Sequence, residues 1–192
     1  MQIVEIRPLQ DLIEVDLRRV MAGYSSSRKY QVSKNETPAK IIFRLELVTL
    51  PEPHTRKFGE DLTADDLVRY REFLTEGFCY GAYAGDELAG VAIAEVRTWN
   101  LTLWIWELHV AASWQRQGIG LKLVDTLARD AQAAGLRTLQ VETQNTNVPA
   151  IEFYRRAGFE MEGIDLSYYT NYDVSDYEVA IFMKRKLPML HV

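Results

Sequence analysis

The sequence is poor in cysteine and histidine and has no long hydrophobic run. Cys79 is its only cysteine, which excludes an internal disulfide and a cysteine-based zinc site and fits a reducing compartment. The three histidines, His54, His109 and His191, are too far apart to predict a metal cluster. No segment approaches the roughly 18 apolar residues of a membrane span, and residues 1–7 do not resemble a secretory signal. We therefore expect a cytoplasmic protein without a bound metal or a membrane partner.

An excess of basic residues is also lacking. The formal net charge is −5, so no broad basic surface is available for a phosphate backbone, and we do not expect nucleic acid as a partner. A cationic small molecule would meet a mildly favourable field. The 192 residues, 47% hydrophobic and 26% charged, are typical of one globular domain spanning residues 1–192.

Hydrophobic periodicity and turn residues predict a mixed α/β domain, antiparallel first and with a βαβ unit in its second half. The predicted elements, in order, are a strand at 2–7, a helix at 11–20, a loop at 22–38, a strand at 41–50 ended by residues 51–54, a helix from 61 or 63 to 74, strands at 78–84 and 88–98 joined at Gly85-Asp86, a strand at 101–110, a helix at 118–134 capped by Gly135, a strand at 138–143, a helix at 148–157 closed by Gly158, and strands at 161–170 and 177–186.

The segment with the clearest chemical signal is residues 115–120, Gln-Arg-Gln-Gly-Ile-Gly, between a predicted strand and a long amphipathic helix. Backbone N–H groups and the helix dipole make such a loop suitable for a pyrophosphate. Gly118 and Gly120 lack a Cβ, so phosphate oxygens can approach the main chain. A tight strand-to-helix connection without a ligand is the alternative.

Two other phosphate motifs fit this loop less well. A P-loop needs Lys followed by Ser or Thr after the second glycine, and residues 121–123 are Leu-Lys-Leu. A dinucleotide fingerprint needs a small residue where Leu123 stands. Glu142 resembles the ribose-binding acid of that fingerprint, but the antiparallel hairpins before it argue against such a fold.

The sequence resembles the GNAT superfamily of N-acetyltransferases. The likeness is carried by the Gln-x-x-Gly-x-Gly pattern after a strand that ends in Leu-His-Val, by residues 147–154, Asn-Val-Pro-Ala-Ile-Glu-Phe-Tyr, and by Gly158-Phe159. It implies acetyl-CoA as co-substrate and a largely antiparallel central sheet with a splayed parallel pair of strands, flanked by helices. It also implies an acetyl-CoA-binding core at 101–160, with N-terminal strands, helices and the acceptor side at 1–100 and C-terminal strands at 161–192.

The resemblance further implies roles for individual residues. The strand end would pair with the pantetheine arm, the loop would hold the pyrophosphate, Asn147 would contact the cofactor, and Tyr154 would donate a proton to the leaving thiolate. Without the family likeness, Tyr154 reads as a core residue. The expected cofactor-binding set is Leu108, His109, Val110, Gln115, Arg116, Gln117, Gly118, Ile119, Gly120, Leu121, Asn147 and Tyr154.

Other segments are similar to the streptothricin acetyltransferases, which acetylate an amine of a cationic antibiotic and so confer resistance. They are Trp99-Asn100, residues 142–145, Phe153-Tyr154, and the tail around Asp165, Tyr169 and residues 171–172. The resemblance implies a small cationic amine as acceptor.

Acetyl transfer requires the amine to lose a proton, and two residues are candidates for this step. Glu107 is our candidate catalytic base, and His109, two residues on, faces the same side of the strand and could also relay the proton through water. Glu142, on the neighbouring strand, is a candidate anchor for the substrate ammonium. A solvated surface glutamate and a base-free water chain are the competing interpretations.

Aromatic and acidic residues have two interpretations. Trp99, Trp104, Trp106 and Trp114 favour packing in the core or at the interface of a homodimer. Near the C-terminus, the aromatic and acidic side chains would suit a cationic acceptor, or would simply decorate an exposed loop. This second set is Tyr168, Tyr169, Tyr172, Asp165 and Asp173.

Three functions are therefore compatible with the sequence. The first is an acetyl-CoA-dependent N-acetyltransferase of small cationic amines such as streptothricin-type antibiotics. The second is an acetyltransferase of a protein lysine or N-terminus. The third is a noncatalytic module that binds acyl-CoA.

Overall fold

The computed structural model describes residues 3–176 and 178–188, and the chain divides into two compact units. Unit 1 comprises Met1–Gly23, Lys57–Val141 and Arg185–Val192, and unit 2 comprises Tyr24–Arg56 and Glu142–Lys184. The hydrogen-bonded strand order is β1-β4-β5-β6-β7-β9-β8 in a seven-stranded sheet and β2-β3 in a separate two-stranded sheet. This is the predicted mixed α/β class.

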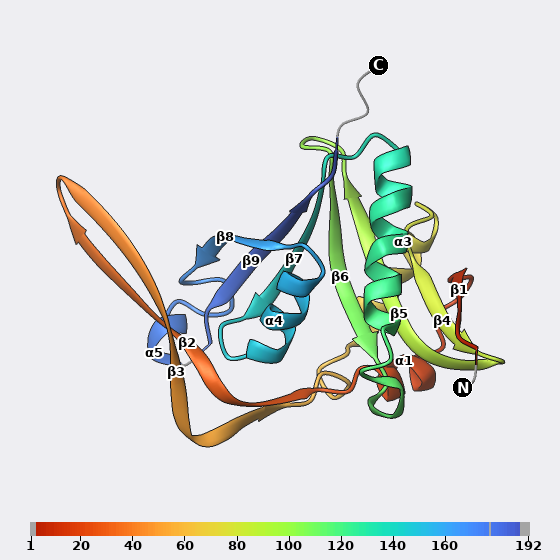
Figure 1. The fold of residues 1–192 in the computed structure, drawn as a ribbon, viewed down its shortest axis with the longest axis horizontal. Helices are drawn as coiled ribbons and strands as arrows, with labels where there is room; N and C mark the ends of the chain where they lie inside the picture. The colour runs from red at the N-terminus through yellow and green to blue at the C-terminus, as the bar shows by residue number, and fades with distance from the viewer. Residues whose placement is uncertain (1–2, 177, 189–192) are drawn as a thin grey trace. The chain divides into compact units, whose positions relative to one another are not determined.

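Unit 1 contains four antiparallel strands of the sheet and the single described parallel pairing (Figure 1). Pairing is antiparallel from β1 to β6, whereas β6 and β7 run parallel. The elements are β1 (Glu5–Pro8), α1 (Glu14–Val20), α2 (Ala64–Leu74), β4 (Tyr80–Ala84), β5 (Glu87–Arg97), β6 (Thr102–Val110), the 3₁₀ turn η1 (Ala112–Trp114), α3 (Ile119–Ala133) and the first residues of β7 (Thr138–Gln144).

Local signals place these elements close to their predicted positions. Thr63 and Asp66 form a reciprocal capping box that starts α2, because each side chain accepts from the other's backbone N–H. Gly85 adopts φ 63° in the β4–β5 turn, and Gly135 adopts φ 77° after α3. The predicted first helix is shorter than expected and begins at Glu14.

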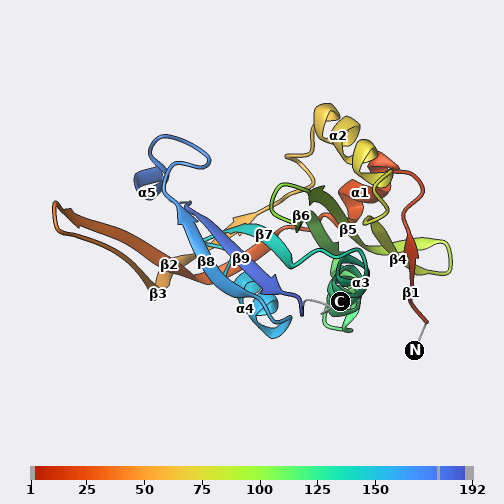
Figure 2. The same ribbon diagram turned by 90° about the horizontal axis from the view of Figure 1, so that it is seen from above.

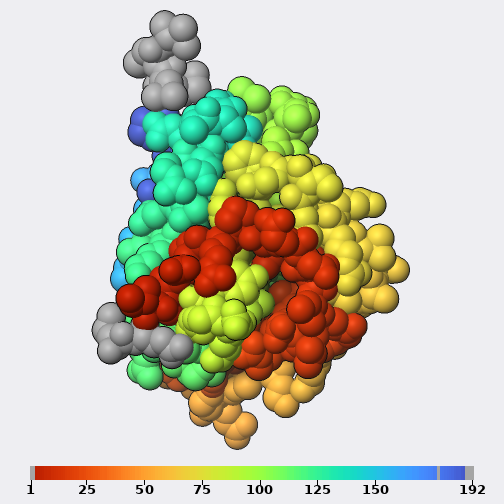
Figure 3. All heavy atoms as spheres, turned by 90° about the vertical axis from the view of Figure 1, so that its right-hand side faces the viewer, coloured from red at the N-terminus to blue at the C-terminus, as the bar shows by residue number. Residues whose placement is uncertain are grey.

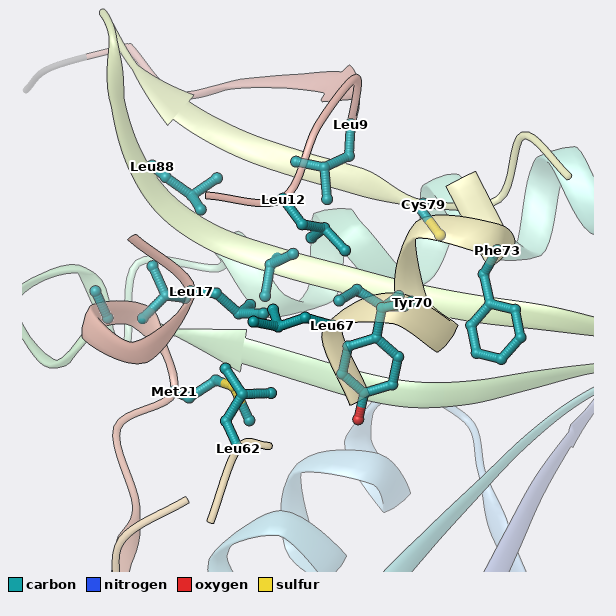
Figure 4. Packing of buried hydrophobic residues seen from close by; sticks show 14 residues of the cluster. Leu9, Leu12, Leu17, Met21, Leu62, Leu67, Tyr70, Phe73, Cys79 and Leu88 are labelled. Carbon is teal, nitrogen blue, oxygen red and sulfur yellow. The ribbon is translucent and has the colours of Figure 1, made fainter. Parts of the chain in front are cut away.

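A hydrophobic cluster fixes α1 and α2 on the β5 region of unit 1 (Figure 4). Leu17, Val91 and Ile93 are at most 1% exposed, and burying each side chain contributes roughly 1.5–3 kcal/mol. Figure 4 also shows the Tyr70 hydroxyl pointing away from the other labelled side chains. In Figure 3 the red N-terminal segment borders the yellow-green atoms of β4 and β5, in line with the pairing of β1 with β4.

Unit 2 contains a long hairpin that the sequence analysis missed. Its elements are β2 (Tyr24–Thr37), β3 (Lys40–Arg56), the end of β7, α4 (Val148–Arg156), β8 (Glu160–Asp165), α5 (Asp173–Asp176) and most of β9 (Ala180–Lys186). Figure 1 shows β2 and β3 side by side in orange, and Figures 1 and 2 both draw β8 next to β9.

The prediction of a loop at 22–38 was wrong. These polar residues form β2, which pairs with β3 from Tyr24 to Thr37. The expected stop at residues 51–54 was wrong as well, because β3 continues to Arg56. Pro51 and Pro53 lie in β3 where its register with β2 shifts, opposite the segment between Ser26 and Arg28. The missing N–H of a proline costs no ladder hydrogen bond in such a bulge.

The C-terminal strands also differ from the prediction. The strand expected at 161–170 ends at Asp165, whose carboxylate accepts a hydrogen bond from the Ser167 N–H and turns the chain. The last strand begins at Ala180. Its predicted start at residue 177, the predicted strand start at residue 2, and His191 lie outside the described residues.

Candidate active site

The loop between β6 and α3 has the backbone geometry of an anion site. Arg116 and Gly118 adopt left-handed conformations with φ of 61° and 80°. The side-chain amide of Gln115 donates to the Val110 carbonyl at 3.1 Å, and that of Gln117 donates to the Ser113 carbonyl at 3.3 Å. Left-handed residues inside a tight loop turn successive N–H groups toward one concavity, which suits an anion.

The start of α3 also suits an anion. No side chain caps the helix, and its first turn contains no acidic residue, in contrast to the capping box and two aspartates of α2. The first intrahelical bond runs from the Lys122 N–H to the Gly118 carbonyl, so the preceding amides have no acceptor within the helix. A Cβ placed on Gly118 would meet no atom within 4 Å, so the space beside it is open. These features fit a pyrophosphate.

The end of β6 provides a backbone edge beside this loop. Its ladder with β7 covers only Thr102–Ile105, whereas its ladder with β5 continues to Val110. Burial changes at the same point, since residues 102–105 are buried and residues 106–110 are partly exposed. Within the described ladders, Leu108, His109 and Val110 therefore pair on one side only, and their other side can bind an extended ligand.

Packing of β5 against α3 keeps the loop close to this strand end. Gly90 pairs with Val110, and a Cβ at Gly90 would lie 3.0 Å from the His109 carbonyl oxygen and 3.3 Å from a methyl carbon of Ile119. Only glycine permits this approach without a shift of the backbone.

Glu107 is the centre of a hydrogen-bonded cluster in unit 1. One carboxylate oxygen accepts from the Tyr70 hydroxyl at 2.5 Å, and the other lies 2.6 Å from His109 Nε2. The Phe58 ring lies against the His109 imidazole with ring centroids 5.4 Å apart. The predicted shared face of Glu107 and His109 is confirmed, and Tyr70 is a partner that the sequence analysis missed.

Tyr70 is a hydrogen-bond donor to this cluster. Burial, followed by the Glu107 charge, raises the pKa of Tyr70, which therefore stays protonated and donates to the carboxylate. In the tautomer whose Nε2–H donates to Glu107, His109 Nδ1 is an acceptor, and Glu107 orients the imidazole.

Asn147 and Tyr154 lie in unit 2, on and before α4. Asn147 is the N-cap of this helix, and its Oδ1 accepts from the Ala150 N–H at 3.2 Å. Tyr154 is 6% exposed, with ring centroids 5.3 Å from those of Phe153 and Phe159. Both residues thus have a structural role, and their roles toward a cofactor stay predictions.

The predicted acceptor residues separate into two groups. The Tyr169 hydroxyl donates to Glu142 in a very short hydrogen bond, so these two residues do come together. Asp165 and Asp173 instead hold loops. Asp173 is 1% exposed and accepts from the N–H groups of Tyr169 and Thr170, so it cannot offer its charge to a ligand at the surface.

A second acidic cluster in unit 2 was missed. Glu178 accepts hydrogen bonds from Tyr24, Arg56 and Thr146 at 3.2, 2.7 and 2.9 Å, and His54 Nε2 lies 3.1 Å from it. These partners come from β2, β3 and the turn before α4. No local pattern could reveal them, because they are 32 to 154 residues from Glu178 in the sequence.

The tryptophans lie mostly within protein contacts. Arg97 lies 3.7 Å from the ring centroid of Trp104, which is 4% exposed, and Trp106 donates its indole N–H to Glu95. Only Trp99 of the four is largely exposed, at 84%.

Among the described residues, no group of three His, Cys, Asp or Glu side chains could hold a metal ion. No described helix is long and apolar enough to cross a membrane.

Comparison with known proteins decides which family has this architecture. The model of the acetyltransferase (GNAT) family matches residues 40–159. The chain belongs to the GNAT acetyltransferase family. The predicted enzyme class, an acetyl-CoA-dependent N-acetyltransferase, is confirmed by this membership, and so is the predicted fold.

Several GNAT relatives are streptothricin acetyltransferases. That of Streptomyces lavendulae is 34% identical over 130 residues, which cover 68% of this chain and 65% of the relative. That of Escherichia coli is 35% identical over 105 residues, 54% of this chain and 59% of the relative. The chain thus matches less than two thirds of the length of these two relatives. An uncharacterized N-acetyltransferase of Bacillus subtilis, YvbK, is 34% identical over 57% of this chain and 71% of its own.

Solved structures extend the likeness to nearly the whole chain. Nourseothricin acetyltransferase superposes with a TM-score of 0.73 at 26% identity, covering 96% of this chain and 99% of its own. A Bacillus anthracis protein solved in complex with acetyl coenzyme A superposes with a TM-score of 0.72 at 21% identity, covering the same shares.

Proposed function

We propose that this chain transfers the acetyl group of acetyl-CoA to a primary amine of a small cationic acceptor, and that the acceptor is a streptothricin-type antibiotic. The observation that supports acetyl-CoA as the co-substrate is the uncapped start of α3, which follows the left-handed residues Arg116 and Gly118. The support for the acceptor is the likeness to streptothricin acetyltransferases in sequence and to nourseothricin acetyltransferase in structure.

The residues of the loop and strand end would hold the co-substrate. The backbone N–H groups of residues 117–121 would bind the pyrophosphate, with Gln115 and Gln117 keeping the loop in shape. The one-sided edge at Leu108–Val110 would hydrogen-bond the pantetheine arm. When bound, acetyl-CoA supplies an activated acetyl group as a thioester.

Proton transfer is assigned to two places. Glu107 and His109 would together accept the proton of the amine, with Tyr70 fixing the Glu107 carboxylate. Tyr154 would return a proton to the thiolate. Glu107→Gln should lower kcat while leaving the KM for acetyl-CoA close to the wild-type value, and an unchanged kcat would remove Glu107 from the mechanism.

A second acceptor class is supported by one observation. The ribosomal protein bS18 alanine N-acetyltransferase of Salmonella typhimurium is 31% identical over 55% of this chain and 69% of its own length. An N-terminal peptide amine is therefore the alternative acceptor.

Turnover with a panel of amines tests both acceptor classes. CoA release is measured with streptothricin, an aminoglycoside, spermidine, lysine and a peptide with an N-terminal alanine. We expect the highest kcat/KM with streptothricin. A preference for the peptide would favour the alternative, and no turnover with any amine would overturn the proposed function.

A further inference from the structure

One buried polar atom in unit 2 has no hydrogen-bond partner among the residues that the structure describes. The side-chain carbonyl oxygen of Gln144 is buried and accepts no hydrogen bond among the described residues, and Gln144 as a whole is 8% exposed. An unsatisfied buried acceptor lowers the stability of the folded state. A bound ligand with an N–H group can supply the missing donor.

Neighbouring side chains fix the direction of this amide. The Tyr169 hydroxyl donates its single proton to Glu142, and it also shares a hydrogen bond with Gln144. Since the hydroxyl proton is already used, the oxygen of Tyr169 must accept this second bond, and the donor must be the NH₂ group of Gln144. The carbonyl oxygen of the amide is therefore the atom left unpaired.

The side chains linked to this amide through Tyr169 include an anion, the Glu142 carboxylate. Glu142 and Gln144 are two residues apart on β7, so their side chains leave the same face of the strand. Tyr168 and Tyr169 meet edge to face with ring centroids 5.3 Å apart and are 43% and 37% exposed, so this cluster reaches the surface. A carboxylate, an amide oxygen and aromatic rings together match an ammonium group, which has only N–H donors.

We propose that Gln144 determines acceptor specificity: its carbonyl oxygen accepts an N–H bond from an ammonium group of the acceptor, beside the Glu142 carboxylate and the Tyr169 hydroxyl. The inference rests on the proposed function and adds a residue that recognises the acceptor rather than the cofactor. Tyr169 is the positioning residue, because it holds both Glu142 and the amide.

Gln144→Leu tests this assignment, with Gln140→Leu as the matched control. Gln140 lies on the same strand and the same face, four residues earlier. Its replacement therefore removes a side-chain amide of the same kind at a position outside the cluster. The measured values are KM for the panel amine with the highest kcat/KM, KM for acetyl-CoA, and Tm. Gln144→Glu keeps an acceptor oxygen at this position and serves as the second variant.

We expect Gln144→Leu to raise the KM for the amine at least about tenfold, the loss of one hydrogen bond from a charged donor, and to leave the KM for acetyl-CoA unchanged. Its Tm should equal or exceed that of the wild type, because the orphan acceptor is gone. Gln144→Glu should keep the amine KM within about threefold of wild type, and Gln140→Leu should match the wild type in both constants.

Three results would overturn the inference. An amine KM within twofold of wild type in Gln144→Leu shows that the oxygen does not contact the acceptor, while continued turnover leaves the proposed function intact. An equal rise of both KM values shows a general structural effect. Equal losses in Gln144→Leu and Gln144→Glu show that the oxygen is not required. Absence of turnover in the wild type would instead overturn the proposed function and this inference with it.

Discussion

Replacing Gly118 by alanine separates the fold of the loop from its use as an anion site. Gly118 has φ 80°, and a Cβ there would touch no heavy atom within 4 Å. The substitution therefore lowers the free energy of unfolding only by the strain of an alanine in the left-handed conformation, about 1–2 kcal/mol. For a chain of this size, each kcal/mol lowers Tm by roughly 2–4 °C.

Gly135 supplies a control with nearly the same geometry at the other end of α3. Its φ is 77°, and a Cβ there would also meet nothing within 4 Å. Gly135→Ala should therefore lower Tm by a similar amount. Valine would be a poorer choice at either position, because a β-branched side chain is strained further in this conformation.

The two variants should differ in affinity for acetyl-CoA. At Gly118 the new methyl group would lie where a phosphate oxygen approaches the main chain, and loss of one charged hydrogen bond costs about 1.5–3 kcal/mol, or roughly 10- to 100-fold in Kd. Isothermal titration calorimetry with acetyl-CoA measures this change. Equal acetyl-CoA affinity in Gly118→Ala and Gly135→Ala would refute the assignment of the loop.

Three further predictions concern single side chains. Tyr154→Phe should lower kcat by roughly 100-fold with little change in the KM for acetyl-CoA, as for loss of a general acid, and an unchanged kcat would leave Tyr154 a core residue. Burial raises the pKa of the Cys79 thiol to about 11, so iodoacetamide at pH 8 should label it slowly in the native protein and rapidly in urea; equal rates would contradict its burial. Burial opposes ionisation of Asp173, but hydrogen bonds from Tyr169 and Thr170 outweigh it and lower the pKa below the ordinary 3.8. The stability that Asp173 contributes is thus present above about pH 4 and lost as pH falls through the lowered pKa, so Asp173→Asn should cost about 2 kcal/mol at pH 7 and progressively less as the pH is lowered below 3.8 in urea unfolding, whereas no loss at pH 7 would contradict this role.

The loop between β6 and α3 could be predicted from the sequence because its signal is local. The glycine pattern stands between a strand and an amphipathic helix, and Gly118 does adopt the left-handed conformation that only glycine accepts readily. The strands that lead to it, β4 to β6, have apolar faces with turn residues between them. Their positions were correct to within one or two residues.

The hairpin β2–β3 could not be predicted because its first strand has few apolar residues. Most side chains of Tyr24–Thr37 are polar and exposed, and only Ser26, Tyr30 and Val32 are buried. The strand exists because its backbone pairs with β3 over its length, and such pairing leaves no mark in the hydrophobic pattern.

The partners of the candidate residues were hidden for a similar reason. Tyr70 and Glu107 are 37 residues apart, and Tyr169 and Glu142 are 27 apart. The unpaired carbonyl oxygen of Gln144 could not be predicted either, because it follows from the separate contacts of the two amide atoms in the folded chain. Residue type and spacing show which side chains can do chemistry, whereas long-range contacts decide which of them meet.

In the proposed reaction, acetyl-CoA gives its acetyl group to an amine of a small cation. Incubation of the protein with streptothricin and acetyl-CoA carrying a ¹³C-labelled acetyl group, followed by NMR of the product, tests it most directly. We expect one new amide-linked acetyl signal on streptothricin, formed at the rate of CoA release. CoA release without labelled streptothricin, or neither of the two, would contradict it.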